Sequence, residues 1–321
     1  MLRVNTNCAI IKKDIQNGRC ESMKYSEDTL VSWTAPLSQT EEQRAENTIR
    51  MIKSAIDADD QLKSMSIEVF VQGSFANNTN VRSESDVDVC VMLKDTFHEV
   101  FPEGKSRADY GFIASSMTFQ KYREMVKVAL QRKFSAESVH DGNKSLKINE
   151  NTYHVQADVV PAFQLRNYYY NGSTNPNDYV EGTWFVSKSG EEVSNYPKRH
   201  IRRGNEKNVA TNYDYKKLVR IMKHIKNNMV DDHRANGDKI TSFLVECLVY
   251  QVPNDIICRY STWTDTVKNA IIYLYGEIAN NRHKGWTEVS GMLYLFINRK
   301  WTDTDVKQWL SNAWDYLGYG D

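Results

Sequence analysis

A short alternating segment in the first third of the chain constrains its fold more than any other feature. From Asp86 to Leu93, valines alternate with aspartates and a cysteine. In a β-strand, successive side chains point to opposite faces. Asp86, Asp88 and Cys90 would therefore share one face and Val87, Val89 and Val91 the other. The pattern predicts a half-buried strand that presents two carboxylates side by side.

The rest of the first two thirds predicts an α+β lobe. Ser38 and Glu41 form a capping-box pattern ahead of apolar residues at helical spacing, so a helix is expected to begin there. A second helix is expected over Thr118–Phe134. Further strands are expected at Ile67–Gln72, Lys144–Ile148 and Thr152–Val160. Together with the alternating segment, these strands would form a mixed sheet.

The remainder of the chain divides into a polar stretch and a helical region. Residues 171–212 are rich in glycine, proline and polar side chains, and we expect mainly loops there. Apolar residues at helical spacing then predict helices at Tyr213–Met229, Thr241–Val252, Trp263–Asn281, Ser290–Asn298 and Thr304–Leu317. We therefore expect an N-terminal extension (1–37), an α+β core lobe (38–204) and an all-helical lobe (205–321), with the active site in a cleft between the lobes.

Three carboxylates and one turn carry the predicted chemistry. Asp86 and Asp88 would project from one strand, and Asp158 from another strand whose opposite face is apolar. Mg²⁺ prefers carboxylate, water and phosphate oxygens. A turn at Gly73-Ser74 would offer backbone N–H groups and a hydroxyl to phosphate oxygens. Each feature alone is typical of a solvated strand edge or an ordinary turn, but the combination favours nucleotidyl transfer assisted by two metal ions.

Charge and composition exclude several other classes. Lys plus Arg and Asp plus Glu both number 41, so the net charge is zero. Proteins that bind long nucleic acids usually carry a basic excess, and none is expected as a partner. The longest apolar runs are too short for a membrane span. The five cysteines are scattered without CxxC spacing, which favours a reducing cytoplasm over a disulfide framework or zinc site.

The motifs together resemble a known family. The stretch from Val71 to Arg82 (V-Q-G-S-F-A-N-N-T-N-V-R), followed by S-D-V-D-V, resembles the signature of the bacterial CD-NTases. These are cyclic-oligonucleotide synthases of anti-phage CBASS systems, related to animal cyclic GMP-AMP synthase and sharing a polymerase-β-like fold. The likeness continues through Q-A-D-V-V-P, D-Y-V-E-G-T, N-Y-P-K and S-F-L-V-E-C-L, from about residue 33 to the C-terminus. The E-G-x-x-F and N-Y-P-K-x-H segments are most similar to clade E.

The resemblance implies roles for individual residues. Asp86, Asp88 and Asp158 would be catalytic and would hold two Mg²⁺ ions, which Mn²⁺ can replace. Nucleotide contacts would come from both lobes: Gln72, Gly73, Ser74, Asn195, Lys223, Ser242 and Phe243. Among these, Asn195 matches a position that reads a nucleobase, where Asn goes with uracil. Without the resemblance, the local sequence predicts that Asn195 is a turn residue, that Lys223 lies on a solvated helix face, and that Ser242 is a helix N-cap.

Some positions depart from the family pattern or lie outside it. Phe243 stands where many relatives carry a tyrosine that stacks on a base, and Glu192 where a pyrimidine-using relative carries an aromatic residue. Residues 1–32 and 230–239 have no counterpart in the family. The basic run 198–203 is typical of a solvated loop, with substrate phosphates as a second possibility. The C-terminal tryptophans are typical of helix packing.

The expected function is the synthesis of a cyclic dinucleotide from UTP and ATP, with release of pyrophosphate at each step. The product would activate a downstream effector. Two alternatives stay open from the sequence. One keeps the chemistry but transfers the nucleotide to another acceptor, such as a linear oligonucleotide, a protein or a small molecule. The other is a non-catalytic binding module, whose usual mark, a lost metal carboxylate, is not seen in this sequence.

Overall fold

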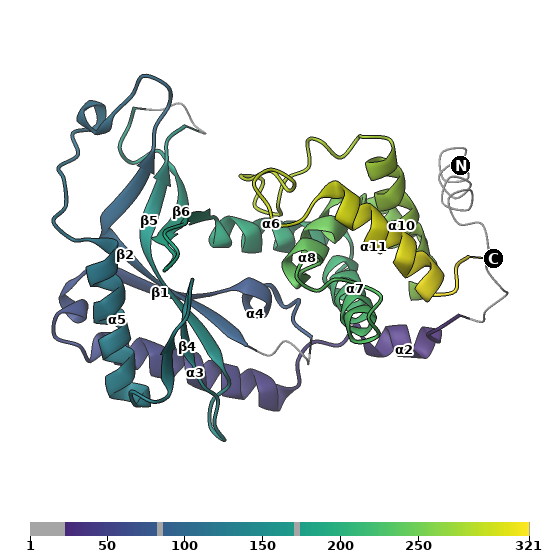
Figure 1. The fold of residues 1–321 in the computed structure, drawn as a ribbon, viewed down its shortest axis with the longest axis horizontal. Coiled ribbons are helices and arrows are strands. Elements are labelled where there is room, and N and C mark those ends of the chain that lie inside the picture. Colours follow the sequence, from purple (N-terminus) through teal and green to yellow (C-terminus); the bar gives the residue numbers. More distant parts are fainter. Residues whose placement is uncertain (1–22, 82–85, 170–173, 321) are drawn as a thin grey trace. The chain divides into compact units, whose positions relative to one another are not determined.

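The computed structural model describes residues 23–81, 86–169 and 174–320. Residues 1–22 of the expected extension and residues 82–85 of the family signature lie outside the described residues. The chain divides into two compact units (Figure 1). We call residues 37–77 and 82–198 the sheet unit, and residues 1–36, 78–81 and 199–321 the helical unit. Among the described residues, no helix combines the length and apolar character needed to cross a membrane.

In the sheet unit, the described residues form one mixed sheet of seven strands. The strands follow one another in the order β1 (Ile67–Gln72), β2 (Val87–Val100), β5 (Ala157–Asn167), β4 (Leu146–Ile148) and β3 (Val139–Asp141). Outside this order, β6 (Val180–Val186) pairs with β5 and also with β7 (Glu192–Asn195). Only the β2–β5 pairing is parallel among the pairs formed by the described strands. The expectation of a mixed sheet is confirmed.

Two helices of the sheet unit build its main hydrophobic core. The side chain of Ser38 accepts from the backbone of Glu41, so α3 (Gln39–Asp57) begins with the expected capping box. Thr118 caps α5 (Phe119–Phe134). Both helices lie along the sheet in Figure 1, and their apolar residues form one buried cluster with Val87, Val89 and Val91 of β2. This face of β2 is the one that the alternation predicts to be buried.

The opposite face of the sheet is less polar than the alternation suggests. Cys90 and Met92 of β2 are completely buried there and form a small apolar cluster with Ala162 and Phe70. The strand is therefore covered on both sides along its middle, and the prediction of a half-buried strand holds only at its first residues. β2 also continues to Val100, well past the predicted end at Leu93.

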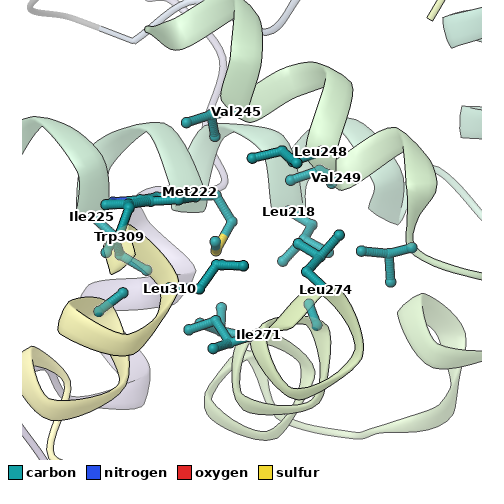
Figure 2. Packing of buried hydrophobic residues seen from close by; sticks show 14 of the residues in the cluster. Leu218, Met222, Ile225, Val245, Leu248, Val249, Ile271, Leu274, Trp309 and Leu310 are labelled. Carbon is teal, nitrogen blue, oxygen red and sulfur yellow. The ribbon is translucent and has the colours of Figure 1, made fainter. Parts of the chain in front are cut away.

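The helical unit is organised around α7 (Asp214–Asp231) and α8 (Ser242–Gln251). They pack with α10 (Trp263–Ala279) and α11 (Asp303–Tyr316), and shorter helices complete the unit: α2 (Glu27–Ser32), α9 (Asn254–Arg259) and most of α6 (Pro197–Ala210). Figure 2 shows the centre of this core, where Met222, Leu248, Ile271 and Leu310 come from four different helices. Trp309 and Trp314 are buried in it, which confirms their role in helix packing.

Two stretches differ from the sequence-based expectation. Residues 171–212, expected to be loops, contain β6, β7 and α6. Pairing with β5 stabilises β6 despite Gly182, and α6 starts with a proline, which suits the first turn of a helix. Conversely, residues 290–298 are irregular rather than helical. Gly291 and Asn298 adopt positive φ angles of 72° and 54°, which interrupt any helix there.

Candidate active site

The pairing of strands places three candidate residues in one row. Gln72 of β1 is in register with Asp88 of β2, and Asp88 is in register with Asp158 of β5. Lys147 of β4 continues the row on the far side of Asp158. Residues paired across neighbouring strands project to the same face of a sheet, about 5 Å apart. Asp88 and Asp158, which lie far apart in the sequence, are therefore neighbours at the start of the only parallel pair among the described strands.

Asp86 lies just before β2 and is electrostatically coupled to this row. Its carboxylate accepts a hydrogen bond from the side-chain amide of Gln156 at 3.0 Å. Burial, and then the negative charge of Asp158, raise the pKa of Asp86 above its ordinary value, while Lys147 and the bond from Gln156 oppose the rise. Asp86 and Asp158 thus lie close enough for their charges to repel each other.

Asp158 has the clearest capacity for a further ligand. Its Oδ1 atom is buried, and no hydrogen-bond donor of the described residues reaches it. A buried carboxylate oxygen without a partner is costly, and a cation would relieve that cost. No three His, Cys, Asp or Glu side chains of the described residues form a ready metal cluster. Mg²⁺ needs no such cage, because it is commonly held by one or two carboxylates, water and substrate phosphates. The aspartates therefore fit a divalent cation that substrate helps to bind.

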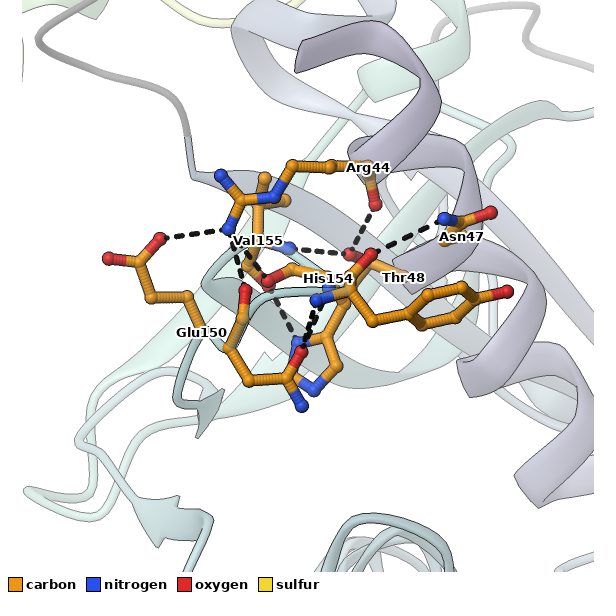
Figure 3. Close-up of polar contacts among 8 residues, drawn as sticks. Arg44, Asn47, Thr48, Glu150, His154 and Val155 are labelled. Atoms are coloured by element: carbon orange, nitrogen blue, oxygen red, sulfur yellow. Dashed lines mark hydrogen bonds and ion pairs between the residues drawn. The ribbon is translucent and has the colours of Figure 1, made fainter. Parts of the chain in front are cut away.

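The loop before β5 explains where Asp158 is placed. The prediction of a strand from Thr152 is wrong, because β5 begins only at Ala157. Figure 3 shows that side chains of α3 hold the preceding residues. Arg44 donates to the carbonyl of Asn151 at 2.7 Å, and the hydroxyl of Thr48 accepts from the backbone N–H of Val155 at 3.1 Å. These bonds compete with strand pairing and fix the entry into β5.

Gly73 and Ser74 start a short helix, α4 (Gly73–Asn77), and the expectation of a simple turn is corrected accordingly. Gly73 adopts a positive φ of 68°, and a Cβ atom on it would lie only 2.0 Å from Oδ2 of Asp88. Only glycine fits this contact without displacing the carboxylate. The backbone at Gly73 is thereby brought directly beside Asp88, whereas the side chain of Ser74 is half-buried.

Asn195 lies on the same sheet face but farther along it. It ends β7 in register with Thr183 of β6, which is in register with Gln164 of β5. Residues 158 and 164 share a face, since an even number of positions separates them, and lie roughly 20 Å apart along the strand. The structure therefore does not bring Asn195 next to the aspartates. Glu192 accepts a hydrogen bond from the Trp184 indole at 3.3 Å.

The helical unit holds the remaining candidates. Lys223 is only 1% exposed, and its Nζ atom donates to Glu246 at 3.1 Å and to Thr79 at 3.2 Å. A solvated helix face is therefore the wrong description of Lys223. Ser242 is the first residue of α8, whereas Thr241 is its N-cap, so the N-cap interpretation of Ser242 is also wrong. Phe243 is partly exposed, with its ring 5.8 Å from that of His200.

The basic run 198–203 is helical, not a solvated loop, because it opens α6. Its side chains also have partners inside the protein. Lys198 forms ion pairs with Glu68 at 2.6 Å and Glu181 at 2.7 Å, and His200 lies 2.9 Å from Glu246. These contacts indicate a structural role for the run.

Four residues near these candidates did not emerge from the sequence. Lys147 and Gln156 act on Asp86, and Thr79 and Glu246 bind Lys223. Strand alternation around Asp158 could have drawn attention to Gln156. No local pattern marks Glu246, because it occupies a buried helix position where an apolar residue is the usual occupant.

Comparisons with known proteins show which family the chain belongs to. The family profile of the Second Messenger Oligonucleotide or Dinucleotide Synthetase domain matches residues 28–199, and that of the cGAS/DncV-like nucleotidyltransferase C-terminal helical domain matches residues 202–318. A cyclic dipyrimidine nucleotide synthase CdnE from Cecembia lonarensis is 43% identical over 92% of this chain and 99% of its own length.

Two solved structures are also similar. The CdnE c-UMP-AMP synthase of Rhodothermus marinus, solved with Apcpp and Upnpp, is 31% identical with a TM-score of 0.81, over 92% of this chain and 98% of that one. The CdnE cyclic dinucleotide synthase of Elizabethkingia meningoseptica, solved with GTP and Apcpp, is 32% identical with a TM-score of 0.76, over 92% and 100%. The chain therefore belongs to clade E of the cGAS/DncV-like nucleotidyltransferases, the CD-NTases, and is a cyclic dinucleotide synthase of that family.

Proposed function

We propose that this synthase joins UTP with a second nucleoside triphosphate, most simply ATP, into a cyclic dinucleotide that signals phage infection to an effector in the cytoplasm. The observation that carries the proposal is the row of Gln72, Asp88 and Asp158 across three strands, with Gly73 against the carboxylate of Asp88. This row supports a site that holds the triphosphate and the attacking hydroxyl on one sheet face.

Asp86, Asp88 and Asp158 are the proposed ligands of two divalent ions, Mg²⁺ or Mn²⁺. Such ions would neutralise charge on the phosphates and lower the pKa of an attacking hydroxyl. Asp158 is also proposed to help orient or deprotonate the attacking hydroxyl; that its buried Oδ1 has no donor from the described residues supports a role for this carboxylate in the site. The oxygen of a ribose hydroxyl then bonds to the α-phosphorus, the bond from the α-phosphorus to the oxygen that bridges to the β-phosphate breaks, and pyrophosphate leaves. A second round closes the ring.

The triphosphate contacts are proposed to come from Gln72, the backbone at Gly73 and the hydroxyl of Ser74. Lys223, Ser242 and Phe243 are proposed to contact the nucleotides from the helical unit. Lys223 would have to exchange its buried partner Glu246 for a phosphate to do so. Such an exchange removes the lysine charge from the buried carboxylate of Glu246, which keeps only its contacts with Thr79 and His200, and this loss opposes the exchange.

The proposed test is incubation of the purified protein with all four labelled nucleoside triphosphates and Mg²⁺ or Mn²⁺, followed by phosphatase treatment and mass spectrometry. We expect a phosphatase-resistant cyclic dinucleotide containing uridine. Asp86→Asn, Asp88→Asn and Asp158→Asn are each expected to lower its formation by at least about 100-fold, because each removes a charge that balances the bound cation. Asp60→Asn, an exposed position, is the matched control.

Two results would contradict the proposal. One is a wild-type protein that forms only linear products or transfers nucleotide to another acceptor. The other is an aspartate variant that retains full activity while remaining folded. Chelation of divalent ions by EDTA is expected to stop product formation. Adding back Mg²⁺ or Mn²⁺ separately then shows which ion restores the synthesis.

Asn195 is the proposed reader of the uracil base, because an amide offers both a donor and an acceptor to a pyrimidine edge. Relatives carry names for both dipyrimidine and dipurine synthases, so base choice varies among similar chains. We expect Asn195→Ser to raise the share of purine nucleotides in the product when all four triphosphates compete. An unchanged product composition would refute this role.

A further inference from the structure

Lys147 extends the row of candidate residues beyond Asp158, within the sheet unit. It lies on β4 in register with Asp158, so both side chains project from the same sheet face, about 5 Å apart. His140 of β3 is in register with Lys147 and continues the row onto that strand. The neighbours of Lys147 along β4, Leu146 and Ile148, are completely buried, whereas Lys147 itself is exposed. Strand alternation therefore fixes this cation on the face that carries the aspartates.

The charge of Lys147 is not consumed by an ion pair. No carboxylate of the described residues pairs with its ammonium, although other cations in this part of the sheet unit are paired. Lys144, in the turn before β4, pairs with Glu191 at 3.0 Å, and Arg44 of α3 pairs with Glu150 at 3.4 Å. Lys147 is thus a solvent-exposed cation that can bind an anion without giving up a partner among the described residues.

The ammonium of Lys147 lies close enough to the aspartates to act on them. Burial and the charge of Asp158 raise the pKa of Asp86, and Lys147 is the strongest of the influences that oppose this rise. The aliphatic stem of Lys147 runs along the turn between β3 and β4, where a Cβ atom on Gly142 would lie 3.5 Å from its Cε atom. Lys147 therefore offers a positive charge directly beside the carboxylates.

The order of the row gives its two ends different surroundings. Gly73, the proposed contact of the donor triphosphate, lies beside Asp88. Asp158, which is proposed to act on the attacking hydroxyl, lies on the next strand, and Lys147 lies beyond it. The acceptor nucleotide carries its own 5′-triphosphate on the same ribose as the attacking hydroxyl. Because two triphosphates repel each other, the acceptor phosphates favour the end of the row that is farther from Gly73.

We propose that Lys147 binds the 5′-triphosphate of the acceptor nucleotide, the one whose ribose hydroxyl attacks. The inference rests on the proposed roles of Gly73 and Asp158. A lysine ammonium is a compact point charge with three donors, which suits a polyphosphate. Selecting an acceptor that carries a triphosphate matters for ring closure, because in the second round this same triphosphate supplies the α-phosphorus and the leaving pyrophosphate.

The test separates the acceptor from the donor. The donor is 2′,3′-dideoxy-ATP, which has no ribose hydroxyl with which to attack, and the acceptor is either UTP or uridine. The two linear products differ in mass, because only the product from UTP keeps a triphosphate, and their initial rates give kcat/KM for each acceptor. If dideoxy-ATP does not react, ATP replaces it, and the products of the two acceptors are again separated by mass.

Three variants are compared with wild type, and their melting temperatures confirm that they are folded. Lys147→Met removes the charge, and Lys147→Arg keeps it. Lys144→Met is the matched control, because Lys144 is an exposed lysine of the same hairpin whose charge is already paired with Glu191.

We expect wild type to prefer UTP over uridine and Lys147→Met to reduce this preference by about tenfold, the value of one hydrogen bond between charged groups. The rate with uridine should stay unchanged, because uridine has no phosphate for Lys147 to bind. Lys147→Arg and Lys144→Met should keep most of the preference. An undiminished preference in Lys147→Met overturns the inference, and so do equal losses with both acceptors, since these would show that Lys147 acts through the aspartates or the fold.

The proposed function and this inference fail in distinguishable ways. A wild type that joins no nucleotides overturns the proposed function and the inference with it. An active wild type whose choice between UTP and uridine does not depend on Lys147 overturns only the inference.

Discussion

Gly73 shows how much of this site is decided by single atoms. Its positive φ suits glycine, and the space that a side chain would take is filled by the carboxylate of Asp88. The same sequence letters, G-S after a strand, are usually an ordinary turn. Only the neighbouring strand, with Asp88 in register with Gln72, gives this glycine its specific role.

Gly73→Ala is expected to impair both the fold and the site. A left-handed φ costs an alanine about 1–2 kcal/mol, and the new Cβ would push Oδ2 of Asp88 away from its position. We expect cyclic dinucleotide synthesis to fall by more than about tenfold, since a displacement of this size misaligns reacting groups. Initial rates and the free energy of unfolding, measured on the same samples, check both effects.

Gly104→Ala separates the effect of the strained backbone from the effect of displacing Asp88. Gly104 also has a positive φ, of 74°, but a Cβ there would meet no atom within 4 Å. It should lose a similar amount of stability, about 1–2 kcal/mol, and keep its activity. Equal activity of the two variants would show that contact with Asp88 does not matter.

At the scale of elements, the parallel pair of β2 and β5 carries the site. The two strands are in register from Val87 and Ala157 to Leu93 and Phe163, so Asp88 and Asp158 meet although the sequence between them contains an α-helix, a 3-10 helix and two strands. The α3 side chains that bind residues 151–155 determine where β5 starts. An offset of one residue would turn Asp158 to the buried face, because strand side chains alternate.

A contact between α6 and the end of α8 predicts a pH dependence of stability. Lys207 of α6 donates to the carbonyl of Val252 at 2.8 Å and to Asn254 at 2.8 Å. Burial lowers the pKa of Lys207 from its ordinary 10.5 to about 8, and Cys258 opposes this only in part. Between these two pH values the unfolded chain carries a proton that the folded chain has released, so this group makes the free energy of unfolding rise with pH.

Lys207→Met removes that dependence. We expect the stability of wild type relative to the variant to increase by up to about 3 kcal/mol between pH 7 and pH 10.5, with most of the change above pH 8. Urea unfolding of both proteins at a series of pH values measures the difference. A difference that stays constant over this range would contradict the lowered pKa.

On the scale of the whole molecule, each unit has its own hydrophobic core, one built on a sheet and two helices, the other on packed helices. The described part of the expected N-terminal extension belongs to the helical unit. Leu30 of α2 joins its core, and the carboxylate of Glu27 accepts from the first backbone N–H groups of α10 at 2.6 Å and 2.9 Å. The helical unit therefore combines segments from both ends of the chain and residues 78–81.

Local sequence patterns determined much of the secondary structure. Strand alternation around Asp88 and the capping box at Ser38 act between residues a few positions apart, so the start of α3 and the apolar face of β2 could be predicted. The family signature, which is also local, indicated the reaction. In residues 171–212 the glycines, prolines and polar residues were misleading, because β6 is itself rich in β-branched and aromatic residues and pairs with β5 and β7.

Tertiary structure alone decided which distant residues meet. It placed Asp158 beside Asp88 and buried Lys223 against Glu246 and Thr79. Strand partners and buried ion pairs depend on which surfaces are removed from water together. The free energy gained by removing these surfaces from water depends on pairs of segments far apart in the chain, so no short stretch of sequence determines it.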